Sequence, residues 1–584
     1  MRLIYIIFFF LISLISRVLL AQSNEWLTFY EKSGFIETPR YQETIEYSKK
    51  LADHSPLITY HSFGSSPQGR DLPLLILSKS GITSVEEIDH NDKAIVLIQA
   101  CIHAGESDGK DAGLMLLRDI VIHKINLELL ENIVILFVPI FNVDGHERFG
   151  PYNRINQNGP SEMGWRATAQ QLNLNRDYLK ADTPEMQAMI NLYQSWMPDF
   201  YIDCHVTDGA DYIYPLTYGL QMHGNLSQGQ SDWIKSKYLP FVESNMKSSG
   251  NPIAPYMDFV QWHNPKNGIK AYMETPRYSG GYAAINNRPA LLIETHMLKN
   301  YRTRVTATYN MLLYSLQFIA SQSDQLKHNN LKADEETKYM SANNTKYILT
   351  YATEKANEVF NYEGYKYTIE KSSLSGGDWY QYSNDPETFS IDYYSWIPKL
   401  SVEVPYAYII PVEFTAIINK LKLHNVKMTG IDNDTTVLVE TFQLENVTWK
   451  PKPFEGRIML DYEVKPIIKK MIFLKGSLII DMNQRAAQVI MHLLEPMAPD
   501  ALVRWGFFNS IFEQKEYAES YVIEKIAREM IDQNPELLIE LEELKNNDAT
   551  FASNPYAVWN WFYQKSPYWD SNIGIYPIGR IMKK

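Results

Sequence analysis

Short apolar runs alternate with stretches of helical periodicity through the first half of the chain. The main runs are 94–102, 133–141, 200–202 and 290–293. Continuous apolar runs of this length are typical of strands buried on both faces of a sheet. Helical segments lie between them, including Pro184–Trp196. This alternation predicts an α/β domain over 23–321, with a mostly parallel or mixed central sheet and helices on both faces.

The second half of the chain has a different pattern. Strand-like segments such as Tyr347–Tyr351 and Phe473–Ile480 predict a β-rich accessory domain over 338–500. Helical periodicity then predicts a helical C-terminal segment over 501–584. The charged stretch 322–337 is rich in Lys, Asn and Glu, and we expect it to be a linker between the two halves. A chain of 584 residues is too long for one hydrophobic core.

The first 21 residues combine a basic start, an apolar core and a terminal alanine, the pattern of a secretory signal peptide. An uncleaved anchor is the alternative, but the apolar run is short and Arg17 interrupts it. We therefore expect an exported protein, periplasmic or extracellular, that leaves the membrane after cleavage.

Charge and cysteine content restrict the partners and the cross-links. The formal net charge of −13 argues against a nucleic acid as the main partner, because phosphate binding needs a basic surface. The two cysteines, Cys101 and Cys204, are too few for a disulfide scaffold. We expect buried free thiols, although one disulfide is compatible with an exported protein.

Polar side chains follow several of the apolar runs. His103 and Glu106 come where the first run passes into a helix, His205 follows the run at 200–202, and Glu294 ends the run at 290–293. In open α/β sheets this edge is where ligands bind. Two imidazoles and one carboxylate, with a fourth position open for water, are the donors of a catalytic zinc site. A further carboxylate from a separate strand, Glu294, is then a candidate general base.

An isolated His-x-x-Glu also fits an ordinary capped turn, so the order of several motifs carries more weight. That order resembles the zinc carboxypeptidases related to carboxypeptidase A, over roughly residues 23–321. The motifs are His103-Ala-Gly-Glu106, Asn142-Val-Asp-Gly145, Trp165-Arg166, Leu174-Asn175-Arg176-Asp177-Tyr178, His205 and Leu292-Ile-Glu294. The resemblance implies a carboxypeptidase A-like fold and one zinc ion bound by His103, Glu106 and His205.

The resemblance also implies roles for the other motif residues. Glu294 would be the general base and proton shuttle, and Arg166 would polarise the scissile carbonyl and stabilise the oxyanion. Asn175 and Arg176 would bind the terminal carboxylate of a peptide. The implied activity is that of a zinc metallocarboxypeptidase acting on peptides with a free C-terminal carboxylate.

Two other functions stay open at this point. A zinc amidohydrolase acting on peptidoglycan fragments or acylated amino acids would use the same metal and base. A catalytically silent binding module on the same fold is the alternative from another class. The sequence does not predict the oligomeric state.

Two positions depart from the family pattern or do not align uniquely. Asn173 stands where the family usually has an aspartate that orients a zinc histidine, and a neutral amide should raise ligand basicity less. A mobile tyrosine covers the substrate in the family, and Tyr272, Tyr278 and Tyr282 all precede Glu294. We expect Tyr282 to take this role, because the glycines before it suggest a loop that can move.

Overall fold

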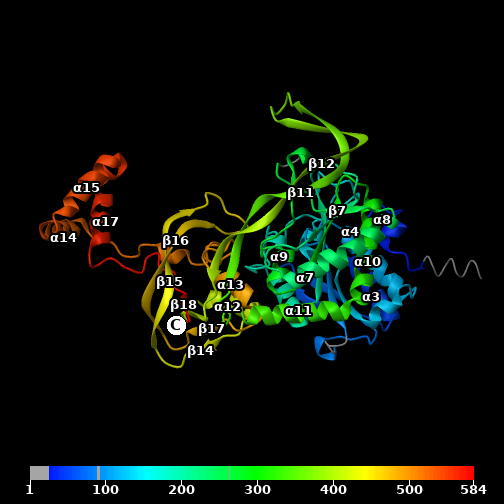
Figure 1. The fold of residues 1–584 in the computed structure, drawn as a ribbon, viewed down its shortest axis with the longest axis horizontal. Coiled ribbons are helices and arrows are strands. Elements are labelled where there is room, and N and C mark those ends of the chain that lie inside the picture. Colours follow the sequence, from blue (N-terminus) through cyan, green and yellow to red (C-terminus); the bar gives the residue numbers. More distant parts are fainter. Residues whose placement is uncertain (1–24, 89–92, 262–263, 584) are drawn as a thin grey trace, which may run out of the picture.

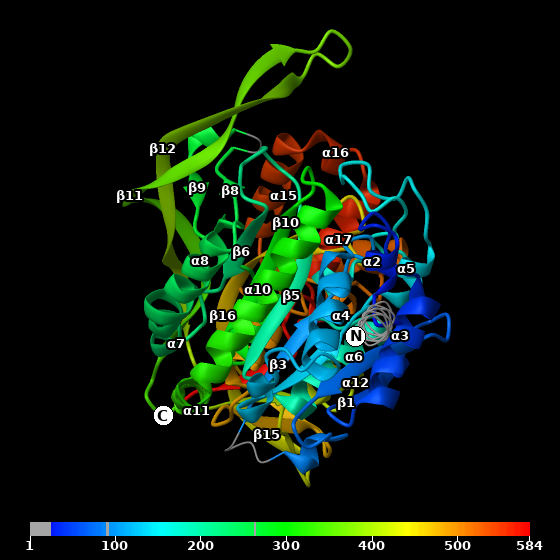
Figure 2. The same ribbon diagram turned by 90° about the vertical axis from the view of Figure 1, so that its right-hand side faces the viewer.

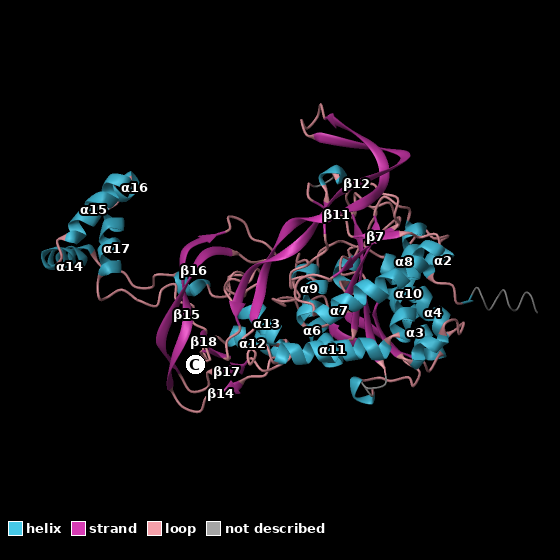
Figure 3. Cartoon of the chain, viewed as in Figure 1, coloured by secondary structure: helices cyan, strands magenta, loops and turns pink. Residues whose placement is uncertain are grey.

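A computed structural model describes residues 25–88, 93–261 and 264–583 (Figure 1). The expected signal peptide, residues 1–21, lies outside the described residues. Figure 3 shows three successive parts of the chain: an α/β unit, a β-rich unit and a small group of helices that stands apart. We name these the N-terminal unit (25–321), the accessory unit (β11 to β18 with α12 and α13) and the helical unit (α14 to α17).

A mixed eight-stranded sheet lies at the centre of the N-terminal unit, in the order β1-β2-β4-β3-β5-β10-β6-β7. The four central strands β4, β3, β5 and β10 run parallel. β1 pairs antiparallel with β2, β2 with β4, and β6 with β10, whereas β7 pairs parallel with β6. This confirms the predicted mixed α/β sheet. The strands are β1 (Ile58–Ser65), β2 (Asp71–Leu77), β3 (Ala94–Gln99), β4 (Ile133–Val138), β5 (Phe200–Thr207), β6 (Leu216–Leu220), β7 (Ile253–Pro255) and β10 (Ala290–His296).

Helices cover both faces of this sheet, because its strands are apolar on both sides. On β3, Val96 and Ile98 pack into one core with α4 and α10, while Ile95 and Leu97 pack into a second core with α6 and α9. Figure 2 shows α4 and α10 beside β3 and β5. The helices are α2 (Phe29–Lys32), α3 (Tyr41–His54), α4 (Asp108–Val121), α5 (Val143–Glu147), α6 (Pro184–Trp196), α7 (Gln228–Trp233), α8 (Leu239–Ser248), α9 (Ser279–Ile285) and α10 (Tyr301–Ser321).

The charged stretch expected to be a linker is a helix, α11 (Ser323–Lys338). Leu326, Asn330, Ala333 and Thr337 recur at helical spacing and are buried, while the charged side chains between them are mostly exposed. The high charge of the segment therefore belongs to the outer face of an amphipathic helix.

The accessory unit begins with a hairpin of two unusually long strands, β11 (Lys346–Lys371) and β12 (Asp378–Glu403). The hairpin extends away from the body of the molecule at the top of Figure 1. Nearer its base it joins two short strands of the N-terminal unit, β8 (Asp258–Phe259) and β9 (Ile269–Lys270), in the order β11-β12-β9-β8. The sequence predicted only the first five residues or so of β11.

A six-stranded sheet in the order β14-β17-β13-β18-β15-β16 forms the rest of the accessory unit. Its core is continuous with that of the N-terminal unit, since Ile410, Leu421 and Ile490 belong to the same buried cluster as Ile95 and Leu97. The elements are β13 (Ala407–Ile410), α12 (Thr415–Leu423), β14 (Thr429–Gly430), β15 (Thr435–Trp449), β16 (Leu460–Phe473), β17 (Leu478–Asp481), α13 (Ala487–Leu494) and β18 (Gly579–Ile581).

The helical unit has a small core of its own, which includes Ile523, Leu541 and Phe562. Its helices are α14 (Ser520–Gln533), α15 (Glu536–Asn547), α16 (Ala549–Ala552) and α17 (Pro555–Lys565). Among the described residues, no helix is both long and apolar enough to cross a membrane.

Candidate metal centre and substrate cavity

The topology of the sheet brings the predicted metal ligands together. His205 and Glu294 are register partners in the parallel pair β5–β10, so their side chains leave the same face of the sheet. His103 and Glu106 lie in the turn between β3, the other neighbour of β5, and α4. Gly105 makes this turn possible, because a Cβ there would meet the carbonyl oxygen of Gly164 at 2.6 Å.

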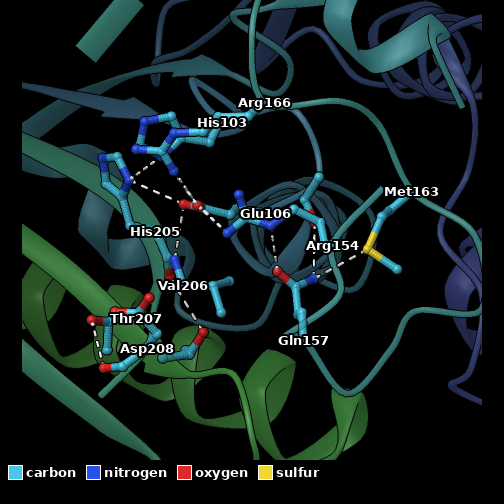
Figure 4. A network of polar contacts seen from close by, with 12 residues as sticks. His103, Glu106, Arg154, Gln157, Met163, Arg166, His205, Val206, Thr207 and Asp208 are labelled. Atoms are coloured by element: carbon cyan, nitrogen blue, oxygen red, sulfur yellow. Dashed lines mark hydrogen bonds and ion pairs between the residues drawn. The ribbon is translucent and has the colours of Figure 1, made fainter. Parts of the chain in front are cut away.

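His103, Glu106 and His205 form a compact buried cluster, shown in Figure 4. The Nδ1 atoms of the two histidines lie 3.2 Å apart, and each lies 3.1 Å from a carboxylate oxygen of Glu106. One donor atom from each residue lies within 4.8 Å of the other two. Two imidazoles and a carboxylate at this spacing, open to a cavity, suit one zinc ion with a free coordination position.

The second nitrogen of each histidine contacts a different kind of group. Nε2 of His103 lies 3.2 Å from the amide oxygen of Asn173, whereas Nε2 of His205 lies 2.9 Å from the carboxylate of Asp203. Asp203 is held in turn by the side-chain amide of Gln99, which donates to it at 2.9 Å. Burial lowers the pKa of His103 to about 3. Burial also opposes protonation of His205, but the carboxylates of Asp203, Glu106 and Glu294 together raise the pKa of His205 well above its usual value.

Two arginines face Glu106. Arg166, which the sequence analysis identified, lies 3.6 Å from its carboxylate, and Arg154, which it missed, lies at 2.6 Å. Burial opposes the charge of Glu106, yet His103 and Arg154 hold the pKa of this carboxylate well below its usual value. Arg154 comes from the long polar stretch after Gly150, where no motif distinguishes it from a solvated side chain.

A cavity of about 550 Å³ opens beside the cluster. Arg166, Asn175, Arg176 and Glu294 line it together with the three candidate ligands. Burial raises the pKa of Glu294 to about 8, and it also raises the pKa of Glu274, a further cavity residue, to about 7. Seven of the eight predicted site residues therefore meet in one place.

The eighth residue, Tyr282, does not reach the cavity. It is fully buried in the core, where its hydroxyl accepts a hydrogen bond from Gln194 at 3.0 Å and lies 2.9 Å from Nδ1 of His424. The glycines before it are part of α9, so they do not form a loop. Tyr278, at the N-cap of α9, lines the cavity instead, and its ring lies 4.4 Å from the guanidinium of Arg176. Tyr256 and Tyr272 line it as well.

The cysteines lie behind the site. Both Cys101 and Cys204 are buried free thiols, as predicted. Burial raises the pKa of Cys204 well above its usual value and that of Cys101 to about 12, so neither is a reactive thiolate.

A buried His-Glu-His cluster at the carboxyl edge of a mixed sheet, open to a polar cavity, defines the class of zinc hydrolases. The sequence profile described as zinc carboxypeptidase matches residues 44–414, so the chain belongs to the zinc carboxypeptidase family. It is 23% identical over 487 residues to carboxypeptidase 2 of Trichophyton rubrum, covering 80% of this chain and 84% of that protein.

Two further relatives are more distant or cover less of the chain. Carboxypeptidase 2 of Trichophyton tonsurans is 22% identical over 487 residues, again covering 80% of this chain and 84% of that protein. The crystal structure of carboxypeptidase A from Helicoverpa armigera superposes with a TM-score of 0.37 at 17% identity, covering 49% of this chain and 75% of that one.

Proposed function

We propose that the protein is a zinc metallocarboxypeptidase that removes C-terminal residues from peptides. The observation that carries the proposal is the convergence of His103, Glu106 and His205 with Glu294 and the Asn175-Arg176 pair on one cavity. A metal site alone would suit many hydrolases. The arginine and amide beside it add a site for a substrate carboxylate.

In this proposal, His103, Glu106 and His205 hold the zinc ion. The bound ion would polarise the scissile carbonyl and make a bound water more acidic. Glu294 lines the same cavity from the adjacent strand and acts as the base that takes the proton of the attacking water. It then passes that proton to the leaving amine. A carboxylate whose pKa burial has raised is suited to both steps.

The two cavity arginines act on different parts of the substrate. Arg166 lies near Glu106, and its guanidinium donates to the oxygen on which negative charge develops. Arg176, with the side-chain amide of Asn175, binds the terminal carboxylate and so sets which peptide bond lies at the metal. The amide oxygen of Asn175 is buried and has no hydrogen-bond partner among the described residues, so it is available to accept a hydrogen bond from a ligand.

The direct test compares peptides that have a free C-terminus with their C-terminal amides, using the zinc-loaded protein. We expect hydrolysis from the free C-terminus only, and we expect Glu294→Gln to abolish it while zinc stays at one equivalent. Equal cleavage of the amides would favour a zinc amidohydrolase, and no hydrolysis sensitive to Glu294→Gln would favour a silent binding module.

We also propose that the protein is exported, because residues 1–21 have the pattern of a signal peptide. Sequencing of the secreted protein should then find Gln22 at the N-terminus.

A further inference from the structure

The accessory unit contacts the N-terminal unit at the two segments that carry the proposed carboxylate-binding residues. One segment runs from Asn173 to Asp182 and includes Asn175 and Arg176. The other is the pair Arg277-Tyr278, in which Arg277 makes the contact and Tyr278 lies beside Arg176. Asn175, Arg176 and Tyr278 line the cavity, and Leu174 of the first segment belongs to the core that the two units share.

Glu455 makes the first contact. It lies in the turn between β15 and β16, and its carboxylate accepts a hydrogen bond from the backbone N–H of Asn173 at 2.7 Å. The side-chain oxygen of Asn173 accepts in turn from the backbone N–H of Asn175 at 3.0 Å and lies 3.2 Å from His103. Glu455 therefore contacts Asn173, and Asn173 contacts both His103 of the metal cluster and Asn175 of the proposed substrate-binding pair.

Asp500 makes the second contact. It is fully buried, and its carboxylate accepts hydrogen bonds from Nε of Arg277 at 2.5 Å and from its backbone N–H at 3.1 Å. The guanidinium of Arg277 also lies 4.8 Å from the ring centre of Trp505. Since a buried pair is costly to break, Arg277 is fixed by the accessory unit. Tyr278 follows it in the chain and stacks on Arg176.

Further contacts fix the far end of the first segment. Lys420 and Arg457 lie 3.0 Å and 2.6 Å from the carboxylate of Asp182, and Nε2 of His424 lies 2.8 Å from the carbonyl oxygen of Leu179. All three cationic or imidazole groups belong to the accessory unit. The segment around Arg176 is thus held on both sides by residues from outside the unit that contains the metal cluster.

We infer that the accessory unit positions Asn175, Arg176 and Tyr278 for the substrate's terminal carboxylate, with Glu455 and Asp500 as the positioning residues. This inference rests on the proposed carboxypeptidase function and assigns a role to the second half of the chain. Loops carry several accessible conformations, and a site built on them needs outside contacts to hold its geometry. The accessory unit supplies those contacts without touching the reacting atoms.

The test uses the full-length zinc enzyme and the variants Glu455→Ala and Asp500→Asn. Glu463→Ala, at an exposed position on β16, is the matched control. We expect KM for a peptide with a free C-terminus to rise about three- to tenfold in each variant, with kcat within about twofold and zinc content unchanged. Glu455→Gln keeps a hydrogen-bond acceptor and should restore most of the lost affinity.

The outcomes separate this inference from the proposed function. A wild-type enzyme without carboxypeptidase activity would refute the proposed function itself. An active wild-type enzyme with unchanged KM in the folded variants would overturn the inference alone, as would a parallel loss of kcat and zinc. Because Asp500 is buried, its variant can fail to fold, and Glu455→Ala then decides.

Discussion

Asp203 and Asn173 support the two candidate zinc histidines unequally. A carboxylate stands behind His205, whereas His103 has only a neutral amide. A carboxylate partner raises the basicity of an imidazole ligand more than an amide does. From the sequence, Asn173 was expected to support one of the zinc histidines weakly, and the structure shows that this histidine is His103. Asp203 had no expected role, because only the structure shows that its carboxylate lies against His205.

We therefore predict that Asp203→Asn weakens zinc binding about ten- to a hundredfold, and that Asn173→Asp strengthens it or shifts its pH dependence. Competition with a chromophoric chelator measures both affinities directly. If Asn173→Asp binds zinc with wild-type affinity at every pH, the amide of Asn173 does not limit zinc binding.

Glu185, in the first turn of α6, links stability to pH. It is fully buried, and burial raises its pKa from a usual value of 4.5 to about 7. The folded state then binds a proton that the unfolded chain has lost, so stability falls as pH rises from about 4.5 to 7 and stays low above that. The total loss is about 3 kcal/mol.

Glu185→Gln should therefore gain thermal stability relative to the wild type at pH 8 but not at pH 4.5. Melting curves at both pH values provide the measurement, with Glu543→Gln at an exposed position of α15 as the control. A gain of the same size at both pH values would show that the effect does not come from this proton.

At the scale of elements, strand ends and the helix Pro184–Trp196 were predictable, whereas the start of α9 was not. Buried strands followed by polar residues indicated where His205 and Glu294 would meet, because parallel strands place their ends at one edge. The sequence could not show that α9 begins at Ser279. Because of this start, Tyr282 lies on the helix and is buried in the core, whereas Tyr278 precedes the helix and lines the cavity. Most of the long hairpin β11–β12 also escaped prediction, since much of it is exposed and lacks a buried face.

The two tyrosines should consequently respond differently to loss of the hydroxyl. We expect Tyr278→Phe to raise KM or lower kcat severalfold with the melting temperature unchanged, because Tyr278 lines the cavity. Tyr282→Phe should leave kinetics near wild type and cost about 1 kcal/mol, because it removes the contacts to Gln194 and His424. Kinetics and thermal melting of both variants measure the contrast, and the reverse pattern would restore Tyr282 as the covering residue.

At the scale of the whole molecule, the chain's three parts are joined in different ways. The N-terminal and accessory units share one core, so removal of either unit would expose apolar side chains of the other. The C-terminal strand β18 pairs with both β13 and β15, and Arg580 on it lies 3.0 Å from the buried carboxylate of Glu495. The helical unit, by contrast, closes its own small core.

Removal of the helical unit should therefore be tolerated if β18 is kept. The backbone N–H of Gly574 donates to the carbonyl oxygen of Ile511 at 2.8 Å, so the two ends of the insertion are adjacent. We predict that replacing 514–570 by a short Gly-Ser linker leaves kcat/KM within about twofold and the melting temperature within a few degrees.

Two shorter chains provide the contrast. A chain that ends at Phe512 also loses β18 and leaves Glu495 buried without Arg580, which costs about 3–5 kcal/mol. A chain that ends at Ser321 exposes the shared core and should be insoluble or unfolded. Circular dichroism and peptidase assays of the three proteins measure the ranking. Full activity of the chain ending at Ser321 would show that the accessory unit is dispensable, and would contradict its role in holding Arg277 and the segment around Arg176 in place.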